Sequence, residues 1–171
     1  MRHGRILIAT LLASLLGGCS TVGSVTSVLA SSVANTFSGE PRPAYLHWGG
    51  LLISTSADAN GNSPIAFDIV FVRDQATLEK LQVLSAARWF TTRQEWQRIF
   101  PDTLIVRSLE LVPDQTLRLT ESELGSPLVA GVLLFANYAT AGEHQARLSL
   151  QTDGALVRLG PADFTVINYK F

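Results

Sequence analysis

The fold class of this chain is decided by residues 64–71, which read PIAFDIVF. Apolar residues alternate through this segment, and the alternation predicts a β-strand with one strongly buried face. Residues 57–63 (ADANGNS) come directly before it and are dense in turn formers; Asn60 and Gly61 tolerate positive φ. Residues 45–56 predict a preceding strand, in which Gly49-Gly50 indicates a bulge or bend.

Helical periodicity follows the strand. Residues 74–85 predict a helix that Asp74 caps and that places Leu78, Leu81 and Leu84 on one side. Residues 92–95 (TRQE) match a capping box and predict the start of a second short helix. Its expected apolar face consists of Trp96, Ile99 and Phe100, with Pro101 after its end. We expect the aromatic residues Trp89, Trp96 and Phe100 to pack helix against sheet; a surface aromatic patch for a partner is the alternative.

The rest of the chain returns to strands, predicted at 104–112, 116–120, 129–138, 146–150, 155–159 and 164–171. Residues 129–138 are apolar on both faces, which is typical of a central strand. Residues 152–154 (TDG) indicate a hairpin between two alternating runs. Together these elements predict a mainly β protein: a two-sheet antiparallel β-sandwich with a short helical insertion at about residues 74–100.

The start of the chain has the pattern of a secretion signal. Residues 1–5 contain Arg2, His3 and Arg5 and no acid, and residues 6–16 form an apolar run too short to span a membrane. Leu16-Gly17-Gly18-Cys19 resembles the bacterial lipobox, which implies lipidation of Cys19 and cleavage between Gly18 and Cys19. An ordinary cleaved signal with a chance cysteine is the alternative, but Cys19 is the only cysteine of the chain. Ser20 after the cysteine favours the outer membrane over the inner one.

Three regions follow from these patterns: a signal peptide (1–18), a lipidated tether (19–43) and a β-sandwich domain (44–171). Apolar residues at helical spacing in the tether fit a short helix over about 25–36. Removal of residues 1–18 takes away two of the 13 basic residues and no acid, so the mature net charge is 11 − 14 = −3. This balance argues against nucleic acid as a partner.

No catalytic or metal-binding pattern appears in the sequence. The mature chain has two histidines, His47 and His144, and neither has a neighbour at metal-ligand spacing, so each is expected to be exposed or hydrogen-bonded. No Gly-x-Ser-x-Gly elbow and no glycine-rich phosphate loop occurs. We therefore expect a protein that is not an enzyme and that needs no cofactor.

The order of these features resembles the TssJ-type outer-membrane lipoproteins of type VI secretion systems. The resemblance covers roughly residues 43–138, and its clearest pieces are residues 60–64 (NGNSP) and 131–135 (GVLLF). The chain departs from the family where Asp68, Ile69 and Phe71 replace a frequent Arg and Tyr, and it lacks the Trp-Arg pair common near the family's end, after Tyr138.

The resemblance implies a transthyretin-like sandwich that faces the periplasm from a lipid anchor in the outer membrane. It also implies a role in holding the periplasmic domain of the inner-membrane protein TssM. The loop at 57–63 would make that contact, with Asp58, Asn60, Gly61 and Asn62 as binding residues. The alternatives are a pilotin-like chaperone of an outer-membrane pore subunit and a periplasmic small-ligand-binding domain or enzyme, which would require a concave pocket.

Overall fold

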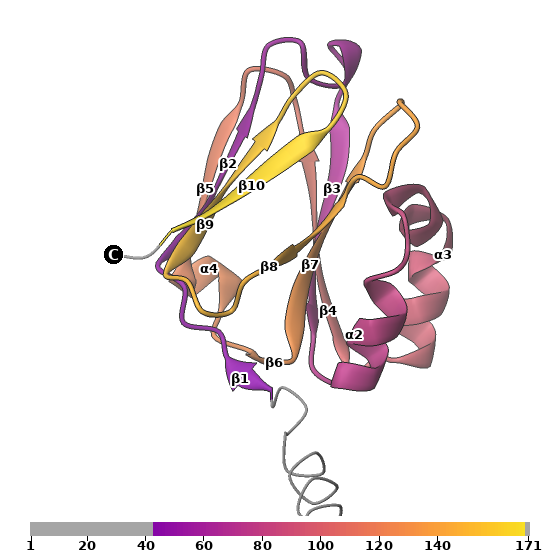
Figure 1. Ribbon diagram of the computed structural model, residues 1–171, viewed down its shortest axis with the longest axis vertical. Helices are drawn as coiled ribbons and strands as arrows, with labels where there is room; N and C mark the ends of the chain where they lie inside the picture. The colour runs from indigo at the N-terminus through magenta and orange to yellow at the C-terminus, as the bar shows by residue number, and fades with distance from the viewer. Residues whose placement is uncertain (1–42, 170–171) are drawn as a thin grey trace, which may run out of the picture. The chain divides into compact units, whose positions relative to one another are not determined.

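Two four-stranded β-sheets face each other, and helices cover the outer side of one of them (Figure 1). The computed structural model describes residues 43–169. The predicted signal peptide, lipobox and tether helix lie outside these residues. Within them, the predicted mainly β sandwich with a helical insertion is confirmed.

The first sheet, called the β2 sheet, consists in spatial order of β10 (Phe164–Tyr169), β9 (Gly154–Leu159), β2 (Gly50–Thr55) and β5 (Thr116–Thr120). Its pairs are antiparallel with one exception: β2 and β9 run parallel, from Gly50 opposite Gly154 to Thr55 opposite Leu159. The sandwich is therefore antiparallel apart from this central pair.

The second sheet, called the β3 sheet, consists of β4 (Leu104–Leu111), β3 (Ile65–Val72), β7 (Gly131–Asn137) and β8 (Gln145–Leu148), all antiparallel. Residues 131–136 of β7 are buried without exception, as predicted for a central strand. A two-residue ladder of β1 (Ala44–Tyr45) and β6 (Leu128–Val129) lies apart from both sheets. Gly49 lies in a bend between β1 and β2, where the sequence predicts one continuous strand.

The central strand β3 is buried on both faces. Phe67, Ile69 and Phe71 pack in the core between the sheets, as their alternation predicts. Val70 and Val72 belong to a second core, between the β3 sheet and the helices. The helical insertion therefore has a packing role, because it covers apolar surface that a bare sheet would expose to water.

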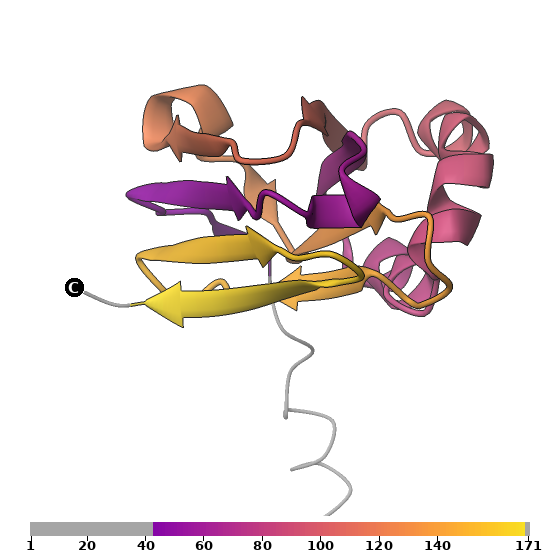
Figure 2. The same cartoon turned by 90° about the horizontal axis from the view of Figure 1, so that it is seen from above.

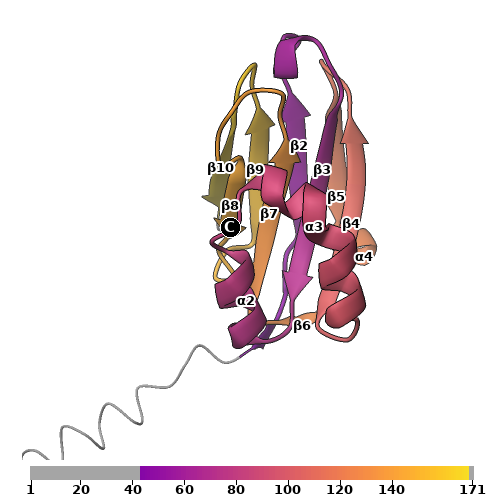
Figure 3. The same ribbon diagram turned by 90° about the vertical axis from the view of Figure 1, so that its right-hand side faces the viewer.

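Two helices form the insertion, α2 (Gln75–Leu81) and α3 (Ala86–Ile99), and both lie over the outer face of the β3 sheet (Figure 3). Asp74 caps α2 as predicted, since its carboxylate accepts a hydrogen bond from the Thr77 amide over 2.9 Å. α2 approaches β7 closely at Gly131, where an added Cβ would lie 2.6 Å from a Leu78 methyl carbon. A larger residue at this position would therefore force the Leu78 side chain to move.

The predicted start of the second helix is wrong. α3 begins seven residues earlier than the capping-box pattern indicates, at Ala86, and its N-cap is Ser85, whose hydroxyl accepts from the Arg88 amide. Thr92 lies inside the helix and donates its hydroxyl proton to the Arg88 carbonyl over 2.8 Å, so it caps nothing. Ile99, expected on the apolar face, is 66% exposed. A capping box does occur at Thr120 and Glu123, at the start of α4 (Glu121–Leu124).

The predicted hairpin at 152–154 is also wrong. β8 and β9 belong to different sheets, so residues 149–153 carry the chain from one layer of the sandwich to the other. The backbone of Asp153 is hydrogen-bonded to other segments of the chain. Its carbonyl accepts from Gly49 N over 2.7 Å, and its amide donates to the Tyr169 carbonyl over 2.9 Å. Two consecutive strands show the same alternation of apolar and polar residues whether they pair in one hairpin or lie on two facing sheets. In both arrangements every second residue is buried.

Candidate functional site

Four loops gather at one end of the sandwich, opposite to the end that carries β1 (Figure 1), and Figure 2 looks onto them from above. They comprise residues 56–64, 112–115, 138–144 and 160–163 and are called the loop end here. Backbone bonds tie them together: Asn60 N donates to Gly160 O over 3.3 Å, and Asp114 N to Ser56 O over 3.2 Å. The predicted contact loop is thus part of a larger connected surface.

The predicted contact loop contains a single turn of 3₁₀ helix, η1 (Ala59–Gly61). Asn60, Gly61 and Asn62 have φ values of 48°, 61° and 62°, so the expected positive φ is confirmed. Asp58 is exposed and accepts a hydrogen bond from the Ser56 hydroxyl over 2.6 Å. Gly61 and Asn62 are also exposed, which places three of the four predicted binding residues at the surface.

Asn60, the fourth predicted binding residue, lies beneath the loop and is only 9% exposed. Its amide nitrogen donates to the Pro64 carbonyl over 3.2 Å, and its Oδ1 accepts from the Ala139 backbone amide over 2.8 Å. The side chain therefore joins the loop to the segment after β7. Asn60 positions the exposed residues around it.

A polar network beneath the loop end joins Tyr138, His144 and Asp163. The Tyr138 hydroxyl donates to the Asp163 carbonyl over 2.9 Å. His144 Nδ1 lies 3.0 Å from Asp163 Oδ1, and its Nε2 lies 2.9 Å from the Thr140 carbonyl oxygen. Burial and, to a lesser extent, the nearby Asp163 carboxylate raise the pKa of Tyr138 above its usual value. These contacts fix two of the loops to each other.

The two histidines follow the sequence expectation. His144 is buried and both of its ring nitrogens face hydrogen-bond partners. His47 is exposed, with its ring centroid 6.5 Å from that of Tyr45. The sequence does not reveal the network around His144, because its partner Asp163 is 19 residues further along the chain.

The loop end is acidic. Its loops contain the carboxylates Asp58, Asp114, Glu143 and Asp163 and no lysine or arginine. Only Asp163 has a salt-bridge partner, His144, in the described part of the chain. Such a surface favours a partner that carries positive charge.

Within residues 43–169, no three side chains of the ligating types His, Cys, Asp and Glu gather where they could hold a metal ion. No helix in that range has the length and apolar character needed to cross a bilayer.

Comparison of the sequence with protein-family models and with curated proteins gives no match. Comparison of the structure with solved structures does give matches. The type VI secretion lipoprotein TssJ1 from Pseudomonas aeruginosa superposes with a TM-score of 0.51 at 10% identity, over 75% of this chain and 98% of that chain. The chain has a TssJ-like fold. This confirms the fold that the sequence resemblance implies.

Two further solved structures match this chain. A structure described as a type VI membrane complex matches with a TM-score of 0.50 and 13% identity, over 69% of this chain and 95% of that chain. Lip from Serratia marcescens, described as a membrane-bound component of the type VI secretion system, matches with a TM-score of 0.47 and 13% identity, over 70% and 96% of the two chains.

Proposed function

We propose that this chain is a non-enzymatic outer-membrane lipoprotein that anchors a type VI-like secretion complex from the periplasmic side. One combination carries the proposal: a TssJ-like sandwich follows a lipobox sequence whose Cys19 is the only cysteine of the chain. A lipid anchor and a rigid binding platform are the two parts that such a role needs.

In this proposal Cys19 carries the lipid anchor, and residues 20–43 set how far the sandwich lies from the membrane. Three acyl chains, at about 0.8 kcal/mol for each buried methylene, hold a protein on a membrane in effect permanently. A chain as long as residues 20–43 spans at most about 80–86 Å when fully extended. The sandwich would then meet its partner in the periplasm, within this distance of the membrane.

The contact with the partner is assigned to the loop end. Asp58, Gly61 and Asn62 are exposed there, and Asn60 holds their loop in place. The loop end lies opposite to β1, the first described strand after the tether (Figure 1). The proposed partner is the periplasmic domain of an inner-membrane component similar to TssM, with basic residues facing the acidic loops.

The experiment is a mild cross-linking pull-down of the tagged, full-length protein from native envelopes, read by mass spectrometry. The proposal predicts recovery of an inner-membrane protein with a large periplasmic domain. Recovery should fall with Cys19→Ser and with the double variant Asp58→Ala/Asn62→Gly. Asp102→Ala is the matched control, because Asp102 is also an exposed aspartate but lies next to β4 at the end away from the loops.

Two results would contradict the anchor function. Recovery of only an outer-membrane pore subunit would indicate a pilotin-like chaperone. Recovery of no partner, from protein that is still lipidated and folded, would exclude a scaffold role.

A further inference from the structure

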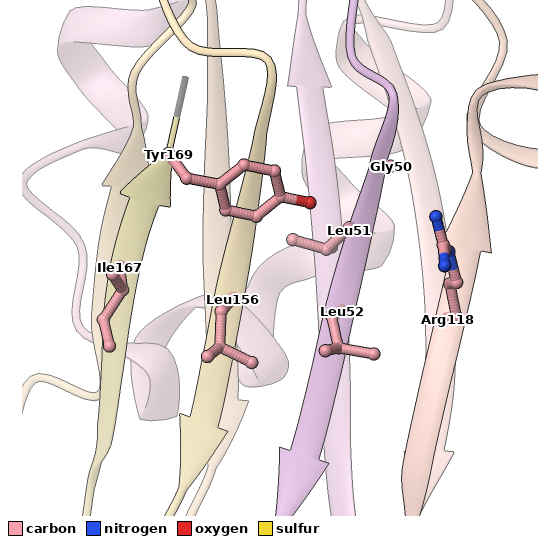
Figure 4. A pocket seen from close by; sticks show the side chains of 7 residues that line it. All are labelled: Gly50, Leu51, Leu52, Arg118, Leu156, Ile167 and Tyr169. Atoms are coloured by element: carbon pink, nitrogen blue, oxygen red, sulfur yellow. The ribbon is translucent and has the colours of Figure 1, made fainter. Parts of the chain in front are cut away.

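The outer face of the β2 sheet carries a hollow of about 370 Å³, shown in Figure 4. Its lining residues are Gly50, Leu51, Leu52, Arg118, Leu156, Ile167 and Tyr169. This volume is at the small end of the range for small-molecule sites, which are typically apolar with a few polar groups. The hollow, called the outer groove here, is separate from the loop end.

Strand register builds the outer groove. Leu52 on β2 lies opposite Arg118 on β5 and Leu156 on β9, and Leu156 lies opposite Ile167 on β10. One row of side chains thus crosses four strands, with three aliphatic residues at one end and a guanidinium at the other (Figure 4). At about 4.8 Å between neighbouring strands, the row is about 14 Å long.

Two glycines lie side by side in the next row: Gly50 lines the groove, and Gly154 lies against the Tyr169 ring. Gly50 lies opposite Gly154, and Gly154 lies opposite Tyr169. A Cβ at Gly154 would lie 2.5 Å from the Tyr169 hydroxyl oxygen and 2.6 Å from the Gly50 carbonyl oxygen. Because Gly154 has no side chain, the Tyr169 ring can pack over it against the sheet, and that ring forms one wall of the groove (Figure 4).

The described lining of the outer groove carries positive charge only. Among residues 43–169, Arg118 is the only charged side chain that lines the groove, and no carboxylate of these residues lines it. Arg118 is exposed and has no salt bridge to any residue between 43 and 169. The contrast with the β3 sheet is clear, since α2 and α3 cover the outer face of that sheet.

We infer that the outer groove binds a single-chain amphiphile with an anionic head, such as a fatty acid. The chain would lie along Leu52, Leu156 and Ile167, and the carboxylate would pair with Arg118 through charge-assisted hydrogen bonds. An extended ten-carbon carboxylate matches the length of the row. This site is independent of the proposed anchor function.

Shape and polarity favour an alkyl chain over other apolar occupants. A helix about 10 Å across is too wide for a hollow of this volume. An extended peptide would bring backbone amides and carbonyls into a lining that offers few partners for them, whereas an alkyl chain has no such groups. A membrane surface is disfavoured because the aliphatic row lies in a hollow, which no flat bilayer fills.

The test uses the chain from residue 19 onward with Cys19→Ser, which is the predicted mature protein without its acyl chains. Decanoate is titrated below its micellar concentration while backbone amide shifts are followed by ¹H–¹⁵N NMR. We expect saturable shifts at Gly50, Leu52, Gly154 and Leu156. Arg118→Gln should weaken binding about tenfold, because it removes a charge-assisted pair. Arg158→Gln is the matched control: Arg158 lies on the same face of β9, two residues from Leu156 and outside the groove lining.

Four results would overturn the inference. They are the absence of saturable shifts, equal weakening by Arg118→Gln and Arg158→Gln, equal affinity for decanoate and decanol, and a preference for an acidic amphipathic peptide at the same residues. The last result would assign the groove to a polypeptide. None of the four bears on the pull-down of the proposed secretion partner, so the two proposals fail separately.

Discussion

The indole Nε1 of Trp89 donates a hydrogen bond to Oδ2 of Asp68 over 2.8 Å, and this contact joins helix α3 to the middle of strand β3. Both residues are fully buried, and the Trp89 ring stacks on Phe135 of β7 with 5.0 Å between centroids. Arg93, one turn further along α3, forms a salt bridge to the same carboxylate at 3.1 Å. The buried carboxylate of Asp68 thus fixes the helical insertion to the sheet.

Asp68→Ala should lower the free energy of unfolding by about 2–4 kcal/mol, because it leaves the buried Trp89 N–H and the Arg93 guanidinium without their acceptor. Asp68→Asn should cost less, since an amide oxygen still accepts from Trp89. Urea denaturation followed by tryptophan fluorescence measures both. An Asp68→Ala loss below about 0.5 kcal/mol would show that the network does not hold the helix.

Asn60→Ala should destabilise the fold by about 1–2 kcal/mol, since it removes the hydrogen bonds to Pro64 and Ala139 from a buried side chain. Asn62→Gly should leave stability unchanged or slightly raised, because Asn62 is exposed and glycine adopts its φ of 62° without strain. Thermal unfolding of the two variants provides the comparison. Equal losses for both would contradict the assignment of Asn60 as the residue that positions the loop.

The stability of the fold should fall as the pH rises above about 10, the ordinary pKa of tyrosine in an unfolded chain. The pKa of Tyr138 is raised in the folded state, so its contribution is complete below the unfolded pKa and is lost as the pH climbs toward the folded one. Urea denaturation between pH 8 and pH 11 measures this slope. Tyr138→Phe should flatten it, and an unchanged slope in that variant would assign the effect to another group.

Cells grown with radiolabelled palmitate should incorporate label into the wild-type protein and none into Cys19→Ser. The wild-type protein should sediment with outer-membrane fractions, because the proposed acyl chains would hold it on that membrane. Gel autoradiography and density-gradient fractionation give the two readouts. Label retained by Cys19→Ser would show that another residue is modified, and it would contradict the assignment of the anchor to Cys19.

Periodicity in the sequence is sufficient to predict most strands. The strand at 116–120 has the predicted bounds. The strand predicted at 129–138 occurs as β7 over Gly131–Asn137 and is central, as its two apolar faces indicate, whereas Val129 belongs to the short strand β6. These predictions succeed because burial on a pleated sheet repeats every second residue. Turn residues with positive φ at 60–62 are predictable for a similar reason, since the conformational preference is local.

Long-range partners are what the sequence does not reveal. Asp68 reads as a polar interruption of an apolar strand, and its role depends on Trp89 and Arg93 21 and 25 residues later. The role of Asn60 depends on the backbone of Ala139, 79 residues away. The same applies to the outer groove, whose row of side chains comes from four strands and is defined only once their register is known.

The central claim is that the loop end of a lipid-anchored sandwich binds the periplasmic part of a secretion complex. Its most direct test is site-specific photo-cross-linking in living cells, with a photoreactive residue at position 62 and, as control, at position 102. The account predicts an adduct with one inner-membrane protein at position 62 and none at position 102. An adduct at 102 alone, or no adduct at 62 in correctly localised protein, would contradict it.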